Sequence, residues 1–485
     1  MKMKSFPSFL VGYGSAVAPA HGLAFAPALA PALAPALALA LALASLPAVP
    51  VCAQQPWTLE QCIDHAVTHN IVIRQRENMT RQQSIQLSTA RNSRLPDLNA
   101  SVGQNFSFGR GLTAENTYTN TNTSSTSFSL GTSVPLLTGN RLPKTIELNR
   151  LNLEAATQDL EKARNDIRVQ VAQQYVQVLF DMEIADVARR QVAIDSAQLH
   201  RLEVMFDVGR ASEAQVVQQR SALAQSQLTA TQAEGNSRLA LLSLSQLLEL
   251  ESMDGFSIVR EGVDSLKAGG SILPSSPSVD SSPLPSPDAI YAEALGLRPE
   301  IQAEQLRLKG SEANIAIARS GLYPQLSFSA GLGSNYYKTS GFQADAFGKQ
   351  LKNNFSQYLG LNLSIPIFNR FSVRNSIRSA KIDRENQQLT LDNTKKQLYK
   401  EIQTAYYNTV TAQQKLLSSK EALQSSREAF RLMQAKYEVG KATSTEFNEA
   451  RTSMLKSESD FTQARYEYLY QTALIQFYRG KPLRF

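Results

Sequence analysis

The feature that most constrains the fold of this chain of 485 residues is an internal duplication. A short motif, made of an aromatic residue, an acid, Val-Gly, a base, Ala and a hydroxyl residue, occurs twice with its glycines 231 positions apart. A repeat of this kind indicates one supersecondary unit that is used twice. Two further motifs, each built around a proline, recur in the same order. The paired segments are Phe206–Ser212 with Tyr437–Thr443, Ser133–Leu136 with Ser364–Ile367, and Leu95–Leu98 with Tyr323–Leu326.

The duplication divides the chain into two repeats with a linker between them. Repeat 1 covers residues 54–250 and repeat 2 covers residues 288–485. The intervening residues, 251–287, include a stretch from Gly269 to Pro287 that is rich in Ser, Pro and Gly. This composition is typical of a linker.

The first 53 residues differ in composition from the rest of the chain. Lys2 and Lys4 precede a long run of Ala, Leu and Pro that contains no Asp or Glu. A basic start, an apolar run and a small residue at its end predict a secretory signal peptide over residues 1–53, cleaved after Ala53. The alternatives are a retained membrane anchor and a lipoprotein modified at Cys52. The repeated prolines argue against the regular helix that an anchor needs.

Each repeat contains a long helical hairpin, according to the spacing of its apolar residues. No Pro or Gly interrupts the stretches that follow the second proline motif, and sixty-odd helical residues span roughly 95 Å at 1.5 Å per residue. Apolar residues recur every seven positions, as at Val171 and Val178, which is typical of coiled-coil packing. The predicted helices cover about 144–206 and 212–250 in repeat 1, and about 375–437 and 443–479 in repeat 2.

Two strands precede the long helices in each repeat, because apolar and polar residues alternate there with a period of two. The connectors 109–125 and 338–354 are rich in Thr, Asn, Gly and Ser, and we expect them to be exposed loops. An apolar face and polar loops favour a membrane-spanning sheet. Four strands cannot close a barrel, which needs about eight or more, and open edges are costly in lipid. The predicted strands cover about 97–109, 126–135, 325–337 and 355–366.

These elements predict strands that are completed by neighbouring copies of the chain, with helical hairpins that enclose a hydrated duct. The helices carry Gln, Asn, Ser and Arg on their remaining faces, so at least one side of each should meet water. The alternative is a periplasmic coiled-coil scaffold protein with a small β-domain and no pore. A signal peptide fits both interpretations.

Charge and motif content argue against several other classes of protein. The net charge is +7, and it falls to +5 when Lys2 and Lys4 are removed with the signal peptide. This excess is too dilute for a nucleic-acid interface. His65 and His69 lie four positions apart, but no third ligand accompanies them, so we expect surface histidines rather than a metal site. We therefore expect no catalytic residues, no metal, no cofactor and no nucleic-acid partner.

The order and duplication of these motifs resemble those of TolC-type outer-membrane efflux proteins, the outer membrane factors. The resemblance covers nearly all of the chain after the signal peptide, and includes Pro135 and Pro366 at the passage from strand to helix. It implies a membrane α+β fold: a homotrimeric outer-membrane β-barrel, four strands per subunit, continued by a long periplasmic α-helical coiled-coil barrel. It also implies a passive duct for efflux of small molecules or for secretion. The implied partners are a periplasmic adaptor and an inner-membrane transporter.

The resemblance implies a pore constriction at Glu446 and Glu449, six and nine positions after the second tip glycine. Their spacing of three puts both on one face of a helix, and rings of carboxylates at a constriction favour cations. The corresponding residues of repeat 1 are Gln215 and Gln218. The competing interpretation is an ordinary helix start, where the helix dipole favours Glu.

The resemblance also implies a latch between the two hairpins near their tips. Tyr437 matches the tyrosine of that latch, but it also fits as a packing residue of the heptad stripe. Ala442 stands where the family has an arginine, and Gln215 where it has the acidic partner. Lys441 or Arg210 is a candidate replacement for the arginine.

The tips of the hairpins are the expected docking sites for the adaptor, since both copies keep a glycine, a basic residue and a hydroxyl residue. Plain helix turns are the alternative. The docking residues are Val208, Gly209, Arg210, Ala211 and Ser212 in repeat 1, and Val439, Gly440, Lys441, Ala442 and Thr443 in repeat 2.

Overall fold

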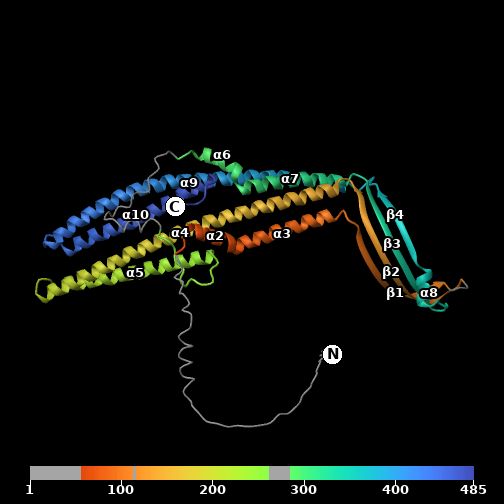
Figure 1. Cartoon of the computed structure of the whole chain (residues 1–485), viewed down its shortest axis with the longest axis horizontal. Coiled ribbons are helices and arrows are strands. Elements are labelled where there is room, and N and C mark those ends of the chain that lie inside the picture. Colours follow the sequence, from red (N-terminus) through yellow and green to blue (C-terminus); the bar gives the residue numbers. More distant parts are fainter. Residues whose placement is uncertain (1–55, 113–115, 261–283, 485) are drawn as a thin grey trace, which may run out of the picture. The chain divides into compact units, whose positions relative to one another are not determined.

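The computed structural model describes residues 56–112, 116–260 and 284–484. The predicted signal peptide, 1–53, and residues 261–283 of the predicted linker lie outside the described residues. Both repeats follow the same order of one helix, two strands, a helix of 67 residues and a helix of 35 residues (Figure 1). Repeat 1 contains α3 (Ile71–Asn92), β1 (Asp97–Leu112), β2 (Tyr118–Thr138), α4 (Arg141–Asp207) and α5 (Glu213–Leu247). Repeat 2 contains α7 (Pro299–Ser320), β3 (Gln325–Thr339), β4 (Ser356–Ser364), α9 (Ser372–Glu438) and α10 (Ser444–Tyr478). The shorter additional helices are α2 (Leu59–His69), α6 (Pro287–Leu297) and α8 (Phe347–Asn353).

Helix α4 is the element on which most of the other helices pack. It contacts α3, α5, α7 and α10, while α9 contacts α7 and α10. Beside the sheet the helices therefore lie in the order α3, α4, α7 and α9, and towards the hairpin turns in the order α5, α4, α10 and α9 (Figure 1). In the part of the chain that the structure describes, no helix has the length and apolar character that a membrane span requires.

Two apolar clusters hold the helices together, and the first of them lies where the repeats meet. The first surrounds Val171 and Val178 of α4, which are completely buried. It includes Phe256 and Ile258, although their positions fall inside the predicted linker, and Ile258 forms a parallel β-bridge with Trp57. Full burial of one such side chain contributes about 1.5–3 kcal/mol. The second cluster consists of Ile290, Ala294, Ile301, Leu391, Leu398, Ile402, Ala405 and Ile475.

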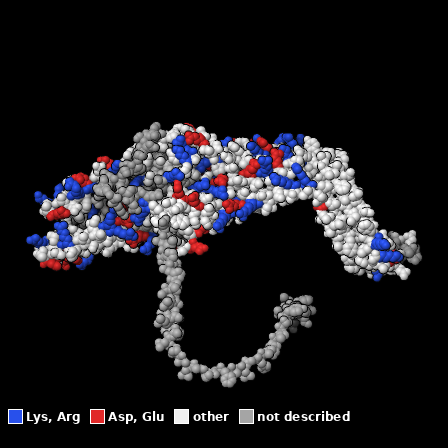
Figure 2. All heavy atoms as spheres, in the orientation of Figure 1, with Lys and Arg blue, Asp and Glu red and all other residues white. Residues whose placement is uncertain are grey.

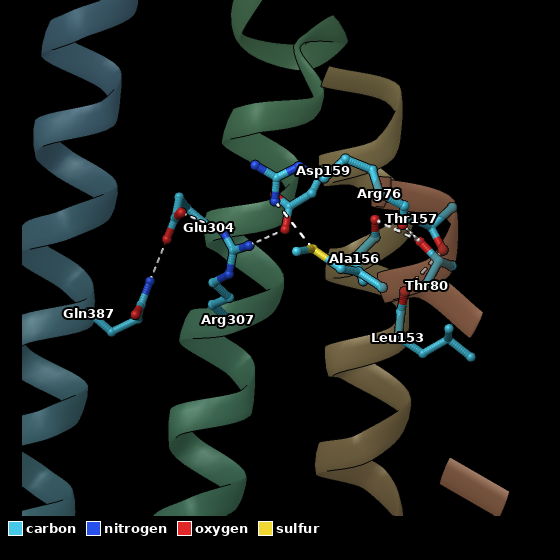
Figure 3. Close-up of polar contacts among 10 residues, drawn as sticks. Arg76, Thr80, Leu153, Ala156, Thr157, Asp159, Glu304, Arg307 and Gln387 are labelled. Atoms are coloured by element: carbon cyan, nitrogen blue, oxygen red, sulfur yellow. Dashed lines mark hydrogen bonds and ion pairs between the residues drawn. The ribbon is translucent and has the colours of Figure 1, made fainter. Parts of the chain in front are cut away.

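Polar side chains tie the four helices beside the sheet to one another (Figure 3). Arg307 of α7 is paired with Asp159 of α4 and, at 2.5 Å, with Glu304 of its own helix. The second oxygen of Glu304 accepts a hydrogen bond from Gln387 of α9 at 2.5 Å. Thr80 of α3 donates to a backbone carbonyl of α4 at 3.4 Å. This row of contacts crosses all four helices and restrains how they slide along one another.

The sheet contains four antiparallel strands in sequence order, so that β1 and β4 form its edges. Strands β1 and β2 continue through most of the connector 109–125, where we expected a loop, and Gly109 pairs with Thr121. The connector is polar on both faces and so lacks the apolar alternation that reveals a strand, although Thr itself favours strands.

Helix α8 covers the last part of β3, beyond the end of β4. The side-chain oxygen of Gln350 accepts the Tyr337 N–H at 2.9 Å, and its nitrogen donates to the Tyr337 carbonyl at 3.1 Å. The ring of Phe347 packs against those of Phe128 and Tyr336. The connector 338–354 therefore contains a helix where the sequence indicated only a loop.

Candidate functional site

The two faces of the sheet differ in chemistry. One face carries large apolar side chains that are strongly exposed, with Leu359 at 79% and Phe108 at 75%. The register places mainly Ser, Thr, Asn and Gly on the opposite face, together with Tyr337 and Tyr358, and Figure 2 shows the strands almost free of charged side chains. Such a sheet suits lipid on one side and water on the other. The apolar face includes Leu98, Val102, Phe106, Phe108, Phe128, Leu130, Leu326, Phe328, Leu332, Leu359, Leu361 and Leu363; the polar face includes Ser101, Asn105, Ser107, Thr121, Thr123, Ser125, Ser127, Ser129, Ser327, Ser329, Asn335 and Asn362.

The predicted docking residues form two exposed turns of the same geometry. Gly209 and Gly440 have φ values of +72° and +73°, in the left-handed region where other residues are strained. Val208 and Val439, which precede them, are about two-thirds exposed, at 64% and 67%. Each hairpin therefore ends in an exposed apolar residue, followed by a base and a hydroxyl residue.

A capping box begins the returning helix in each repeat. The hydroxyl of Ser212 accepts the Gln215 N–H at 3.3 Å, and that of Thr443 accepts the Glu446 N–H at 3.2 Å. In return, the Gln215 and Glu446 side chains accept the backbone N–H of their cap residues at 2.9 and 2.8 Å. The hydrogen bond from the Thr443 backbone lowers the pKa of the Glu446 carboxyl. Glu446 therefore stabilises the start of α10 as a capping residue, independently of any role in a constriction.

The two candidate constriction residues share the exposed side of α10. Glu449 lies one turn beyond Glu446, and both side chains are exposed. Phe447, which lies between them, is buried, and its ring stacks on that of Tyr437 of α9 at 4.7 Å. Packing on α9 therefore turns the two carboxylates away from the core.

Tyr437 joins the two hairpins, as a latch residue would. Its hydroxyl accepts a hydrogen bond from Gln198 of α4 at 3.4 Å. Its ring also packs on Phe447, and the latch role of this residue stays a prediction. Gln215 is engaged in the cap of its own helix, and Lys441 and Arg210 form no ion pair within the described residues.

A further link between the hairpins escaped the sequence interpretation. Asp195 of α4 and Arg451 of α10 form an ion pair whose side chains are only 1% and 9% exposed. Gln219 of α5 donates to the Asp195 carboxylate at 3.4 Å and to its backbone carbonyl at 3.2 Å. Val192 is a heptad position that faces the partner helices, and Asp195, three positions later, lies on the same packing stripe. A charged residue on this stripe was the sequence signal that could have revealed the ion pair.

Two weaker polar contacts join the hairpins nearer the surface. Ser444 of α10 donates to Gln218 of α5 at 3.1 Å. Arg190 of α4 lies 3.7 Å from Glu458 of α10, and its side chain is 61% exposed. The contacts at Tyr437, Arg451, Ser444 and Arg190 therefore tie repeat 1 to repeat 2 near the turns.

The profile of one protein family, described as outer membrane efflux protein, matches residues 63–249 and 290–480. These two segments correspond to the two repeats and make up most of the chain. The chain belongs to the outer membrane efflux protein family. This is the family that the duplicated motifs predicted.

Curated relatives match over part of their length. The pyoverdine export outer membrane protein OpmQ of Pseudomonas aeruginosa is 29% identical over 227 residues, which are 46% of this chain and 42% of OpmQ. Protein CyaE of Bordetella pertussis is 25% identical over 303 residues, which are 61% of this chain and 55% of CyaE. The chain thus spans about half the length of the curated relatives it matches.

Solved structures of outer-membrane channels share this fold. CusC superposes with a TM-score of 0.70 at 18% identity, over 87% of this chain and 91% of CusC. VceC from Vibrio cholerae superposes with a TM-score of 0.67 at 16% identity, over 88% of this chain and 97% of VceC. At these identities the similarity establishes the fold of this chain, which consists of helical hairpins and a small antiparallel sheet.

Proposed function

We propose that this chain is the outer-membrane channel subunit of a tripartite export system, and that three copies form one passive duct. In this proposal the sheets close into a barrel in the outer membrane, and the hairpins continue it as a periplasmic tunnel. The observation that carries the proposal is a sheet with one apolar face, one polar face and two free edges.

The edges of the sheet support closure by other copies of the chain. Among the described residues, β1 and β4 each pair with one neighbouring strand, which leaves one side of each strand unpaired there. Lipid offers no hydrogen bonds to such groups, so each unpaired group costs several kcal/mol there. Pairing β4 of one copy with β1 of the next removes both edges and keeps the apolar face outward.

The outer helices support the same lateral contact. Exposed apolar side chains lie along α3 and α5 on one side of the helical layer and along α9 on the other. A patch of this kind on a helix edge marks a contact with another protein. Packing of α9 against α3 and α5 of the next copy would cover these side chains. They include Met79, Ile85, Val217, Leu228, Leu239, Ile382, Leu389, Leu417 and Leu432.

The hairpin ends are the proposed sites of gating and docking. Three copies bring Glu446 and Glu449 together as rings of carboxylates, which select cations. The Tyr437 and Arg451 contacts hold the closed arrangement of the hairpins. The exposed turns at Gly209 and Gly440 receive a periplasmic adaptor, which connects the duct to an inner-membrane transporter that supplies the energy.

Small molecules are the proposed cargo. OpmQ is named for pyoverdine export, and its similarity to this chain supports an exported compound of that size class. The transporter selects the cargo in this scheme, because the chain itself is a passive duct.

Two adjacent residues of β4 provide the test. Leu361 lies on the apolar face and Asn362 on the polar face. Leu361→Arg places a charge in lipid at a cost of about 2–4 kcal/mol, whereas Asn362→Arg places it in water. We expect the purified protein and Asn362→Arg to be detergent-dependent trimers that conduct ions in planar bilayers, and Leu361→Arg to insert poorly. A monomer that is soluble without detergent and does not conduct would favour the scaffold alternative.

Docking is tested separately by crosslinking. Cysteines at Ala211 and Ala442, one in each turn, should form crosslinks to a periplasmic adaptor encoded beside this chain. Absence of a crosslink from both positions would count against docking at the turns and would leave the channel proposal standing.

A further inference from the structure

Tyr358 of β4 lies in a cross-strand row on the polar face of the sheet. Asn99 of β1 pairs with Gly131 of β2, which pairs with Gly331 of β3, which pairs with Tyr358 of β4. Residues paired in this way point to the same side of a sheet. The row therefore sets one large ring beside two residues without side chains.

The ring of Tyr358 lies over Gly331, and its hydroxyl group points towards Gly131. A Cβ atom placed on Gly331 would be 2.5 Å from Cε1 of the ring, 2.8 Å from Cζ and 2.9 Å from the hydroxyl oxygen. A Cβ atom placed on Gly131, one strand further, would be 3.9 Å from the same hydroxyl oxygen. The ring thus reaches from β4 over β3 towards β2, against the backbone. Its side chain remains 58% exposed, so its outer surface meets solvent.

We infer that Gly131 and Gly331 form a seat for Tyr358, which holds the ring against the barrel wall and sets the bore of the duct at this level. The inference rests on the proposed function, in which this face lines the lumen. Three copies would place three such rings at one height. Seated rings leave the lumen open, whereas rings displaced from their seats would project into it.

The surroundings of the seat indicate how it acts on cargo. Its neighbours on β2 and β3 of the polar face are small and uncharged, such as Ser129, Ser329 and Gly333, and the nearest charged residue of this face is Asp97 of β1, one row away. The ring itself therefore acts on cargo through its size. An aromatic ring over glycine also stabilises a sheet, so a test of the seat has to measure the bore as well as stability.

Gly331→Ala is the test, because it adds the one carbon that collides with the ring. Tyr358 can respond by rotating away from the sheet, and the strand itself tolerates Ala. Gly333→Ala is the matched control: it lies on the same strand and face, but its Cβ would lie 3.5 Å from the Phe128 carbonyl oxygen and 3.6 Å from the Ser356 hydroxyl, at ordinary contact distance. The readouts are single-channel conductance and the largest neutral polymer that enters the channel.

We expect Gly331→Ala to lower conductance on the order of twofold, since side chains fill an eight-stranded barrel and three projecting rings would obstruct part of a twelve-stranded one. Gly333→Ala should conduct like the unmodified protein, and the double variant Gly331→Ala/Tyr358→Ala should recover full conductance. Equal conductance in Gly331→Ala and Gly333→Ala, or no recovery in the double variant, would overturn the inference.

Tyr358→Ala alone decides the matter if Gly331→Ala does not assemble. Removing a ring that is already seated should change conductance and polymer exclusion only slightly. A large gain in conductance would mean that the ring already narrows the lumen, contrary to the inference. An unmodified protein that forms no channel at all would contradict the proposed function instead.

Discussion

Removal of Arg451 should loosen the two hairpins at the buried ion pair between Asp195 and Arg451, which joins them. Asp195 is 1% exposed, and without Arg451 its carboxylate keeps only the hydrogen bond from Gln219. Breaking a buried pair from one side costs about 3–5 kcal/mol, because a charge is left uncompensated. Since Gln219 remains, we expect about 3 kcal/mol for Arg451→Ala.

Hydrogen exchange on the assembled protein in detergent measures this loss directly. About 1.4 kcal/mol corresponds to a tenfold change, so amides of α4 and α10 around the pair should exchange on the order of 100-fold faster. Amides in the sheet should not change. Arg190→Ala is the control, because its contact with Glu458 is long and its side chain is 61% exposed. Such surface pairs contribute about 0–1 kcal/mol.

The double variant Asp195→Leu/Arg451→Met separates a lost link from an orphaned charge. Apolar replacement of a buried pair is often neutral or stabilising, so exchange should return close to that of the unmodified protein. Unchanged exchange in Arg451→Ala would refute the reasoning. So would a double variant that exchanges faster than the single one.

The remaining predictions concern the start of α10. Thr443→Ala removes the N-cap of α10 and should destabilise its first turn by about 1 kcal/mol. Hydrogen exchange at the Phe447 amide measures this loss, and Ser212→Ala is the matched change in repeat 1. An undisturbed first turn in both variants would contradict the prediction. The pKa of Glu446 lies below its ordinary value of 4.5, so its capping contribution is fully present above pH 4.5 and is lost as the pH falls through the lowered pKa. The protection of amides in this turn, relative to their intrinsic exchange rate at each pH, should therefore fall only at acid pH, and Glu446→Gln should remove that fall. In planar bilayers, Glu446→Gln/Glu449→Gln should reduce cation preference and block by divalent cations; unchanged selectivity would reject the constriction.

The family and its general architecture could be predicted because their signals are periodic and occur twice. A stripe such as Val171 and Val178 needs no knowledge of the partner helix, since a heptad spacing alone indicates coiled-coil packing. The extension of β1 and β2 beyond the predicted strands could not be predicted in this way. Its residues, such as Asn120 and Thr121, are polar on both faces of the sheet, so no alternation marks them.

Contacts between the repeats depend on tertiary register, which no local pattern encodes. Asp195 and Arg451 are separated by 256 positions, and they meet only because α4 packs on α10. Gly131, Gly331 and Tyr358 likewise fall into one row only through the pairing of three strands. The capping role of Glu446 was accessible, since Thr443 precedes it by three positions, as in a capping box.

Gln350 affects which strands of the sheet can pair with other polypeptide chains. Its side-chain amide forms hydrogen bonds with both the backbone N–H and the backbone carbonyl of Tyr337, in the part of β3 that extends beyond its pairing with β4. An uncovered stretch of strand is a template for pairing with another chain and for aggregation. With that stretch blocked, β1 and β4 are left as the strands to be joined, so misassembly has fewer places to begin.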